Sequence, residues 1–313
     1  MRLELLSPWV YFMRMSRKSY SVFIIIAGII WGFDGLLRRH LSGLPPTFIV
    51  LIEYLIRLLI VAPFIPKFIP EFKKLTKKDW GVMISLSIIS GALGRILYTA
   101  SLGMVGDISY SVVALLQQTQ PIFAIILAAV ILKERLTKRY GLFAIIAIIA
   151  AYFLTFPSFK PNFTGGNGEL LAALLALGAA LAYGSGTVLS KIILGKISFA
   201  ATAILRFIIV VPVALILTFS LNQTFPIASI NPVQWQYLFA IAITSGIISF
   251  FLYYKGLQHT EVKISTFAEF AWPITAALLG FAILNERLTI VQWIAGAVLL
   301  ADILILSLAT NES

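Results

Sequence analysis

Two charged side chains, Arg95 and Glu269, lie inside apolar stretches with no opposite charge one helical turn away. A guanidinium group in such a place can hold a carboxylate or a phosphate, and a buried carboxylate can take up a proton or hold an ammonium group. This suggests a hypothesis in which a zwitterion, such as an amino acid, lies between Arg95 and Glu269. Two alternatives stay open for Glu269: it takes up and releases a proton, or a Lys or Arg of a neighbouring helix neutralises it.

Amide and aromatic side chains accompany these charges at helical spacing. Gln117, Gln120 and Pro121 fall at i, i+3 and i+4, on one face of a helix. Their counterparts 152 residues later are Glu269, Trp272 and Pro273. A proline inside an apolar helix kinks it and frees a carbonyl group, which is tolerated beside a cavity. We therefore expect both stretches to line a substrate-binding cavity. Four aromatic residues are expected to join them, with packing or lipid-interface anchoring as their alternative role: Trp31, Tyr98, Tyr183 and Tyr253.

These positions correspond because the chain contains an internal repeat. The heptapeptide at 131–137 returns 152 positions later, at 283–289, with six of its seven residues identical. Other matches have offsets between 149 and 155, and the offset changes only between apolar blocks. Whole elements were therefore duplicated while the loops drifted, and such a repeat in a membrane protein is typical of a transporter.

The elements that carry these residues are expected to be membrane spans. Hydrophobic residues make up 60% of the chain and the mean hydropathy is +0.97, whereas a soluble domain is about 45–50% apolar. A spanning helix needs about 20 mostly apolar residues, and backbone groups in lipid must pair within the segment. The sequence predicts ten such helices, at 20–37, 47–66, 80–101, 109–132, 139–156, 168–190, 198–219, 233–254, 263–284 and 290–309.

The Lys and Arg residues are unevenly divided between the two sides of the predicted bundle. Seventeen of the 24 fall on one side, four on the other, and three within spans. Because basic loops stay in the cytoplasm, both termini are expected to be cytoplasmic, in a prokaryotic inner (plasma) membrane. Loops facing anionic lipid also account for the net charge of +11 without nucleic acid.

The predicted fold class is an all-α polytopic membrane protein, with ten transmembrane helices arranged as two inverted five-helix repeats. An odd number of crossings turns the second half upside down, which places a binding site at the midplane between the halves. The predicted divisions are a cytoplasmic lead (1–19), a first repeat (20–156), a linker (157–167), a second repeat (168–309) and a tail (310–313).

Each half has an Arg in its second helix and ends in a P-x(9–12)-L-x-E-R-L-T block followed by a final span. This pattern resembles the drug/metabolite transporter superfamily, specifically its ten-helix EamA-type members, over residues 22–308. The resemblance implies export or exchange of amino acids, nucleosides or other small metabolites, with no ATP-binding part. The predicted function is a secondary active transporter, an exporter or exchanger, of a small polar or zwitterionic metabolite by alternating access. Nucleosides, organic cations and phosphorylated metabolites remain alternative substrates.

Four charged residues are expected to have structural roles. Arg57 can pair with Glu53 one turn earlier, and Arg206 is its counterpart 149 residues later, so both are expected to fasten helices rather than contact substrate. Glu134 and Glu286, from the two E-R-L-T blocks, fall at turns on opposite membrane faces. A helix-end salt bridge or cap is the favoured interpretation for both.

The residue types argue against an enzyme. The chain has no cysteine, which excludes thiol catalysis and cysteine-ligated zinc, and His40 and His259 fall at opposite membrane edges. We therefore expect no catalytic residue, no metal site and no cofactor. The expected partners are a small-molecule substrate, the lipid bilayer and a coupling proton, with the chain a monomer or weak homodimer. A non-transporting membrane receptor or assembly subunit is the alternative from a different class.

Overall fold

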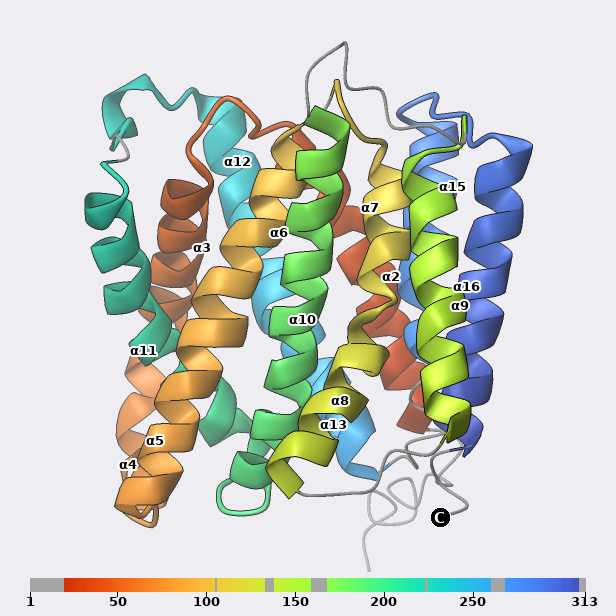
Figure 1. Ribbon diagram of the computed structural model, residues 1–313. Helices are drawn as coiled ribbons and strands as arrows, with labels where there is room; N and C mark the ends of the chain where they lie inside the picture. The colour runs from red at the N-terminus through yellow and green to blue at the C-terminus, as the bar shows by residue number, and fades with distance from the viewer. Residues whose placement is uncertain are drawn as a thin grey trace, which may run out of the picture.

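The computed structural model describes residues 20–104, 106–132, 138–158, 168–222, 225–259 and 268–309, and its regular structure in these ranges is helical (Figure 1). The predicted lead and tail, most of the predicted linker and Glu134 lie outside the described residues.

The first half starts at the lower end of Figure 1 and finishes at the upper end. Its helices in order are α2 (Ser21–Arg39), α3 (Pro46–Val61), α4 (Ile65–Phe72), α5 (Lys77–Leu86), the π-helix η3 (Ser87–Leu93), α6 (Gly94–Gly103), α7 (Tyr110–Gln117), α8 (Gln120–Leu132) and α9 (Lys138–Thr155). The segments α3–α4, α5–η3–α6 and α7–α8 each form one crossing.

The second half repeats this order but starts at the upper end and finishes at the lower end (Figure 1). Its helices are α10 (Gly168–Leu194), α11 (Phe199–Ser220), α12 (Pro232–Ile241), the π-helix η5 (Ala242–Ile248), α13 (Ser249–His259), α15 (Ala271–Ala282) and α16 (Ile290–Ala309). The predicted fold, an all-α membrane protein of two inverted five-helix repeats, is confirmed.

Length and composition support membrane crossing directly. Six helical stretches are long and apolar enough to span a bilayer, namely Ser21–Arg39, Pro46–Phe72, Lys77–Gly103, Gly168–Leu194, Phe199–Ser220 and Pro232–Gly256. Three shorter apolar helices accompany them, Gly141–Thr155, Ala271–Ala282 and Ile290–Ile305. The predicted fourth span is interrupted after Gln117, ahead of Pro121, and Phe270 forms a turn ahead of α15 and Pro273.

A π-helix interrupts the third crossing of each half at equivalent positions. Residues 87–93 of η3 and 242–248 of η5 are separated by 155 positions at both ends, the same offset that relates Gly91 to Gly246. Single π turns often mark functional sites. The sequence contained the matching Ser-Gly pairs, but nothing in their spacing predicted the wider helical turn.

Two glycines 152 residues apart bring helices from opposite halves into close contact. A Cβ on Gly32 of α2 would lie 2.6 Å from Thr275 Cγ2 of α15, and one on Gly184 of α10 would lie 2.7 Å from the Gln120 carbonyl oxygen of α8. Small residues let membrane helices approach in this way. These two crossings join the halves around the centre of the molecule.

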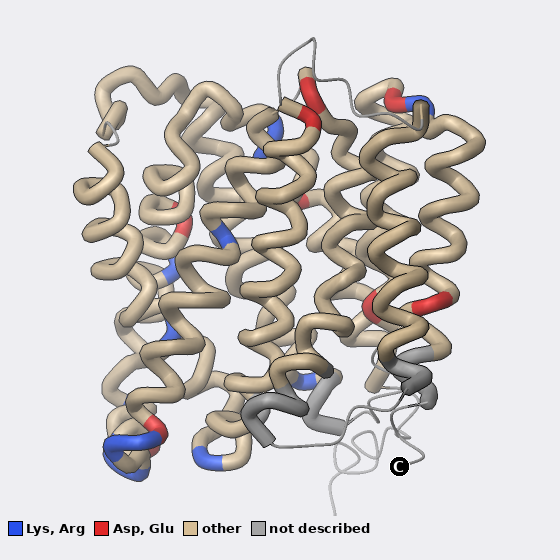
Figure 2. Tube along the Cα trace, viewed as in Figure 1, with Lys and Arg blue, Asp and Glu red and all other residues tan. Residues whose placement is uncertain are grey.

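The two ends of the bundle differ in the charged residues that they carry. Helices α4 and α5 with the turn between them, and the α10–α11 turn, reach the lower end of Figure 2 and carry Lys67, Lys73, Lys74, Lys77, Lys78 and Lys196. We call this end the basic face and the other end the opposite face. Most remaining charges of the described residues lie within the bundle or at the opposite face (Figure 2).

Candidate functional site

A cavity of about 160 Å³ lies between the two halves. Its walls come from the first, third and fourth crossings of the first half and from α10, α11, α13 and residues 269–272 of the second half. The cavity is lined by every residue predicted to bind a substrate and by Pro121. These residues are Trp31, Arg95, Tyr98, Gln117, Gln120, Tyr183, Tyr253, Glu269 and Trp272. Pro273 is buried next to this wall, in the first turn of α15.

The aromatic residues form two clusters that the inverted repeat relates to each other. The rings of Trp31 and Tyr253 lie 5.1 Å apart, and those of Tyr183 and Tyr98 lie 6.4 Å apart. Trp31 corresponds to Tyr183 and Tyr253 to Tyr98, so each half supplies both kinds of partner. Trp272 adds a third ring, 6.2 Å from Tyr98 in an edge-to-face arrangement. Faces and edges of this kind suit a flat aromatic solute.

Several polar groups of the cavity wall are held in place by the neighbouring helix. The Gln117 side-chain amide donates to the Ala176 carbonyl oxygen at 2.5 Å, and that of Gln120 donates to the Thr187 hydroxyl at 3.3 Å. The Gln117 Oε1 atom and the Tyr98 hydroxyl are buried and have no hydrogen-bond partner among the described residues. Since a buried polar atom is costly when unpaired, these two atoms are suited to meet a bound solute or water.

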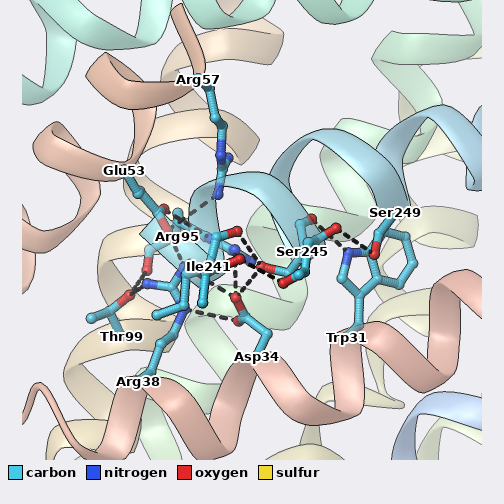
Figure 3. A network of polar contacts seen from close by, with 12 residues as sticks. Trp31, Asp34, Arg38, Glu53, Arg57, Arg95, Thr99, Ile241, Ser245 and Ser249 are labelled. Atoms are coloured by element: carbon cyan, nitrogen blue, oxygen red, sulfur yellow. Dashed lines mark hydrogen bonds and ion pairs between the residues drawn. The ribbon is translucent and has the colours of Figure 1, made fainter. Parts of the chain in front are cut away.

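Five charged side chains form a buried network beside the cavity (Figure 3). We call it the charge cluster, and its members are Asp34, Arg38, Glu53, Arg57 and Arg95. Asp34 pairs with Arg38 at 2.8 Å, and Glu53 pairs with Arg57 at 3.2 Å and contacts Arg38. Hydroxyl groups complete it: Arg38 donates to Thr99 at 2.8 Å and Ser245 donates to Asp34. The cluster thus ties α2, α3 and α6 of the first half to η5 of the second.

Arg95 belongs to this cluster, which corrects the expectation that it is unpaired. Its Nη2 atom lies 3.0 Å from Asp34 Oδ1 and its Nε atom 3.1 Å from Glu53 Oε1. Its side chain is 11% exposed, on the cavity side. The two carboxylates come from α2 and α3, which are distant in sequence. Local spacing therefore could not reveal them. Asp34, one turn before Arg38 in the sequence, is likewise buried and faces the cavity.

Glu269 also has a partner, so the zwitterion hypothesis loses its second free charge. The Tyr253 hydroxyl donates to Glu269 Oε1 at 2.8 Å. Both residues line the cavity. Arg95 and Glu269 therefore face one space, as the hypothesis required, but neither is the isolated charge on which the hypothesis was built.

A second polar network joins helix ends at the opposite face. Glu286, in the turn after α15, pairs with Arg39 at 3.1 Å and accepts from the backbone N–H groups of Tyr110 and Ser111 at 2.5 and 3.0 Å. The Tyr110 hydroxyl donates to the Gly32 carbonyl oxygen. Glu286 is therefore both a salt-bridge partner and an N-terminal cap of α7. We call these contacts the opposite-face latch, because they join the ends of α2, α7 and α15.

The EamA-like transporter family model matches the chain twice, at residues 18–156 and 170–308. The chain belongs to the EamA-like transporter family.

Two curated relatives align over nearly their whole length. The riboflavin transporter ImpX of Fusobacterium nucleatum is 34% identical over 284 residues, covering 90% of this chain and 94% of ImpX. The uncharacterized transporter YwfM of Bacillus subtilis is 24% identical over 299 residues, covering 95% and 97%. One solved crystal structure shares the fold with a TM-score of 0.61 at 16% identity, covering 95% of this chain and 99% of that one. The protein is an integral membrane transporter of the EamA-like family.

Several lining residues of this EamA-like cavity escaped the sequence interpretation. They are Asp34, Ser90, Gln118, Gly186, Thr187, Ser190, Arg206, Phe250 and Tyr254. Arg206 was expected, like Arg57, to be structural, but only Arg206 lines the cavity. A signal did exist for Phe250, which occupies the position of Arg95 in the repeat.

Proposed function

We propose that this protein is a secondary carrier for a flat aromatic metabolite with polar substituents, and that riboflavin is the first compound to test. The observation that carries the proposal is the cavity between the halves, where aromatic rings from both repeats surround amide and hydroxyl groups. Aromatic rings bind flat heterocycles by stacking and edge contacts, while the polar groups orient them.

The unpaired polar atoms of the cavity support this substrate class. The Tyr98 hydroxyl and Gln117 Oε1 have no partner among the described residues, so a heterocycle with N–H and C=O groups would satisfy them. A relative that is 34% identical is named a riboflavin transporter, and riboflavin combines a three-ring heterocycle with a hydroxylated chain. An amino acid is less well suited, because Arg95 and Glu269 are engaged with Asp34, Glu53 and Tyr253.

The transport cycle we propose is alternating access by rocking of the two halves. The opposite-face latch holds one side closed, and its contacts must separate for the cavity to open there. With the basic face in the cytoplasm of a bacterial inner membrane, the cavity in this conformation is shut toward the outside. Direction of transport follows from the solute gradient and from coupling.

Glu269 is our candidate for proton coupling. It is the carboxylate of the cavity that lies outside the charge cluster, and its bond to Tyr253 joins residue 269 to α13 of the same half. Loss or gain of a proton at Glu269 would change this bond and the cavity charge together. A Glu269→Gln variant is expected to retain exchange of substrate but to lose accumulation driven by a pH gradient.

The experiment is counterflow in proteoliposomes preloaded with unlabelled riboflavin and given labelled riboflavin outside. Saturable accumulation is expected in the wild-type protein. A Trp272→Leu variant should raise the half-saturating concentration by about five- to thirtyfold, because a stacked ring contributes about 1–2 kcal/mol. Trp293→Leu is the matched control, since Trp293 of α16 is 58% exposed on the outer surface.

Two results would overturn the proposal. Absence of riboflavin counterflow, with accumulation of amino acids instead, would return the function to the zwitterion class. If the Trp272 and Trp293 replacements change the half-saturating concentration equally, riboflavin does not bind in this cavity.

A further inference from the structure

Arg206 is a buried cation on the cavity wall with no carboxylate in ion-pair distance among the described residues. It lies in α11 with 6% of its surface exposed. Its Nη2 atom donates to the Ser90 hydroxyl at 2.9 Å, and its guanidinium carbon lies 5.4 Å from the centre of the Phe250 ring. Its Nε atom is buried and has no hydrogen-bond partner in the described part of the chain.

The equivalent arginine of the first half shows what Arg206 lacks. Arg57 packs over Gly246 of η5 in the same way that Arg206 packs over Gly91 of η3. Arg57 has Glu53 one turn earlier, 3.2 Å away. The residue at the Glu53 position in the second half is Thr202, whose hydroxyl donates to the Ser198 carbonyl oxygen.

The second difference between the halves concerns the ring beside Arg206. Phe250 stands at the repeat position of Arg95, which in the first half shares Glu53 with Arg57. The second half therefore contains the equivalent arginine, Arg206, but it has Thr202 in place of Glu53 and Phe250 in place of Arg95.

The charges around the cavity are consequently unbalanced. Among the described residues that line the cavity or belong to the charge cluster, four are arginines and three are carboxylates. The other three arginines each pair with a carboxylate. Among the described residues, Arg206 instead meets uncharged groups, namely the Ser90 and Tyr254 hydroxyls and the Phe250 ring. A buried charge without a counter-charge is unfavourable, and an arriving anion relieves this.

We propose that Arg206 determines substrate specificity by binding an oxyanion, a phosphate or a carboxylate, attached to the aromatic solute. This rests on the proposed function and narrows it: the carrier prefers an anionic aromatic compound to its neutral parent. Guanidinium donors suit both oxyanions, since they present paired N–H groups to two oxygens.

The test is a fluorescence titration of the purified full-length protein with three flavins that differ in charge. These are riboflavin, its 5′-phosphate, and a flavin in which a carboxymethyl group replaces the ribityl chain of riboflavin on the same ring nitrogen. Quenching by the cavity aromatics reports binding. We expect wild-type protein to bind at least one anionic flavin about tenfold or more tightly than riboflavin, as a charge-assisted hydrogen bond contributes this much. The phosphate and carboxylate arms show which oxyanion fits.

Two variants locate the preference at Arg206. Arg206→Gln is expected to abolish the preference, so that the anionic flavins bind no more tightly than riboflavin does. Thr202→Glu restores the carboxylate of the first half one turn before Arg206, and is expected to abolish the preference with the arginine still present. Thr202→Gln, which adds similar volume without charge, should keep it. If Arg206→Gln does not give folded protein, the comparison of Thr202→Glu with Thr202→Gln decides.

The outcomes separate the two proposals. Equal binding of charged and neutral flavins by the wild type, or an anion preference that survives in Arg206→Gln or Thr202→Glu, overturns the role of Arg206 and leaves the carrier proposal standing. Failure of the wild type to bind any of the three flavins refutes the proposed substrate class, and this inference with it.

Discussion

Weakening the opposite-face latch should expose the cavity to the opposite side of the membrane. We consider Glu286→Gln, which keeps the shape of the side chain and one acceptor oxygen but removes its charge. Glu286 receives two backbone N–H groups and the Ser111 hydroxyl and pairs with Arg39 at 3.1 Å. The side chains of Glu286 and Arg39 are 10% and 6% exposed, so the pair is nearly buried.

The size of the effect follows from these contacts. Removing one partner from a fully buried ion pair costs about 3–5 kcal/mol, and capping interactions contribute about 1 kcal/mol. Because the latch lies near the membrane surface and glutamine retains part of the capping, we expect a loss of about 2 kcal/mol from the closed state. If these contacts are absent when the cavity is open, this raises the open population by about thirtyfold.

The assay uses the lack of cysteine in the chain. A single Gln118→Cys replacement places one thiol on the cavity wall. The protein is inserted in vesicles in a known orientation, and a membrane-impermeant maleimide is added to the side on which the opposite face lies. Labelling should be about ten- to thirtyfold faster with Glu286→Gln in the same chain. Glu71→Gln is the control, because Glu71 caps α11 at Ser198 near the basic face with similar bonds of 2.6 and 3.0 Å.

One result would refute the reasoning. If the Glu286→Gln protein is folded, yet its thiol is labelled from the opposite face no faster than in the Glu71→Gln control, the latch does not hold the cavity closed.

Three further predictions concern single contacts. Asp34→Asn should lower the unfolding free energy in detergent by about 3 kcal/mol, since it leaves Arg95 with one carboxylate. In the double variant, Arg95→Gln should recover part of this loss of unfolding free energy. If the effects of the two changes on the unfolding free energy simply add, Asp34 and Arg95 do not belong to one charge cluster. Gly184→Leu should abolish transport or folding, because a Cβ there meets the Gln120 backbone, whereas Gly141→Leu, with open space around it, should leave uptake unchanged. Tyr98→Phe should leave the melting temperature of the empty protein unchanged but weaken flavin binding; a lower melting temperature would mean that the hydroxyl serves the fold.

Much of the architecture could be predicted because it depends on local patterns. Apolar length gives the spans, and the duplicated heptapeptide gives the repeat and its inversion. The nine predicted cavity residues do line one cavity, since a helix face is set by periodicity and equivalent faces of an inverted repeat meet at its axis. The two π-helices could not be predicted, because a wider turn depends on how η3 and η5 pack against Arg206 and Arg57.

The sequence by itself therefore determined which helices exist, how the two halves are oriented and which faces turn inward. Only the tertiary structure decided which charges neutralise one another. Arg95 meets carboxylates 61 and 42 residues away in the sequence. Arg57 of the first half pairs with Glu53, whereas its counterpart Arg206 has no carboxylate partner among the described residues. Periodicity places a side chain on a face of its own helix. Ion pairing, in contrast, depends on the depth and rotation of a different helix, which packing of the whole bundle fixes.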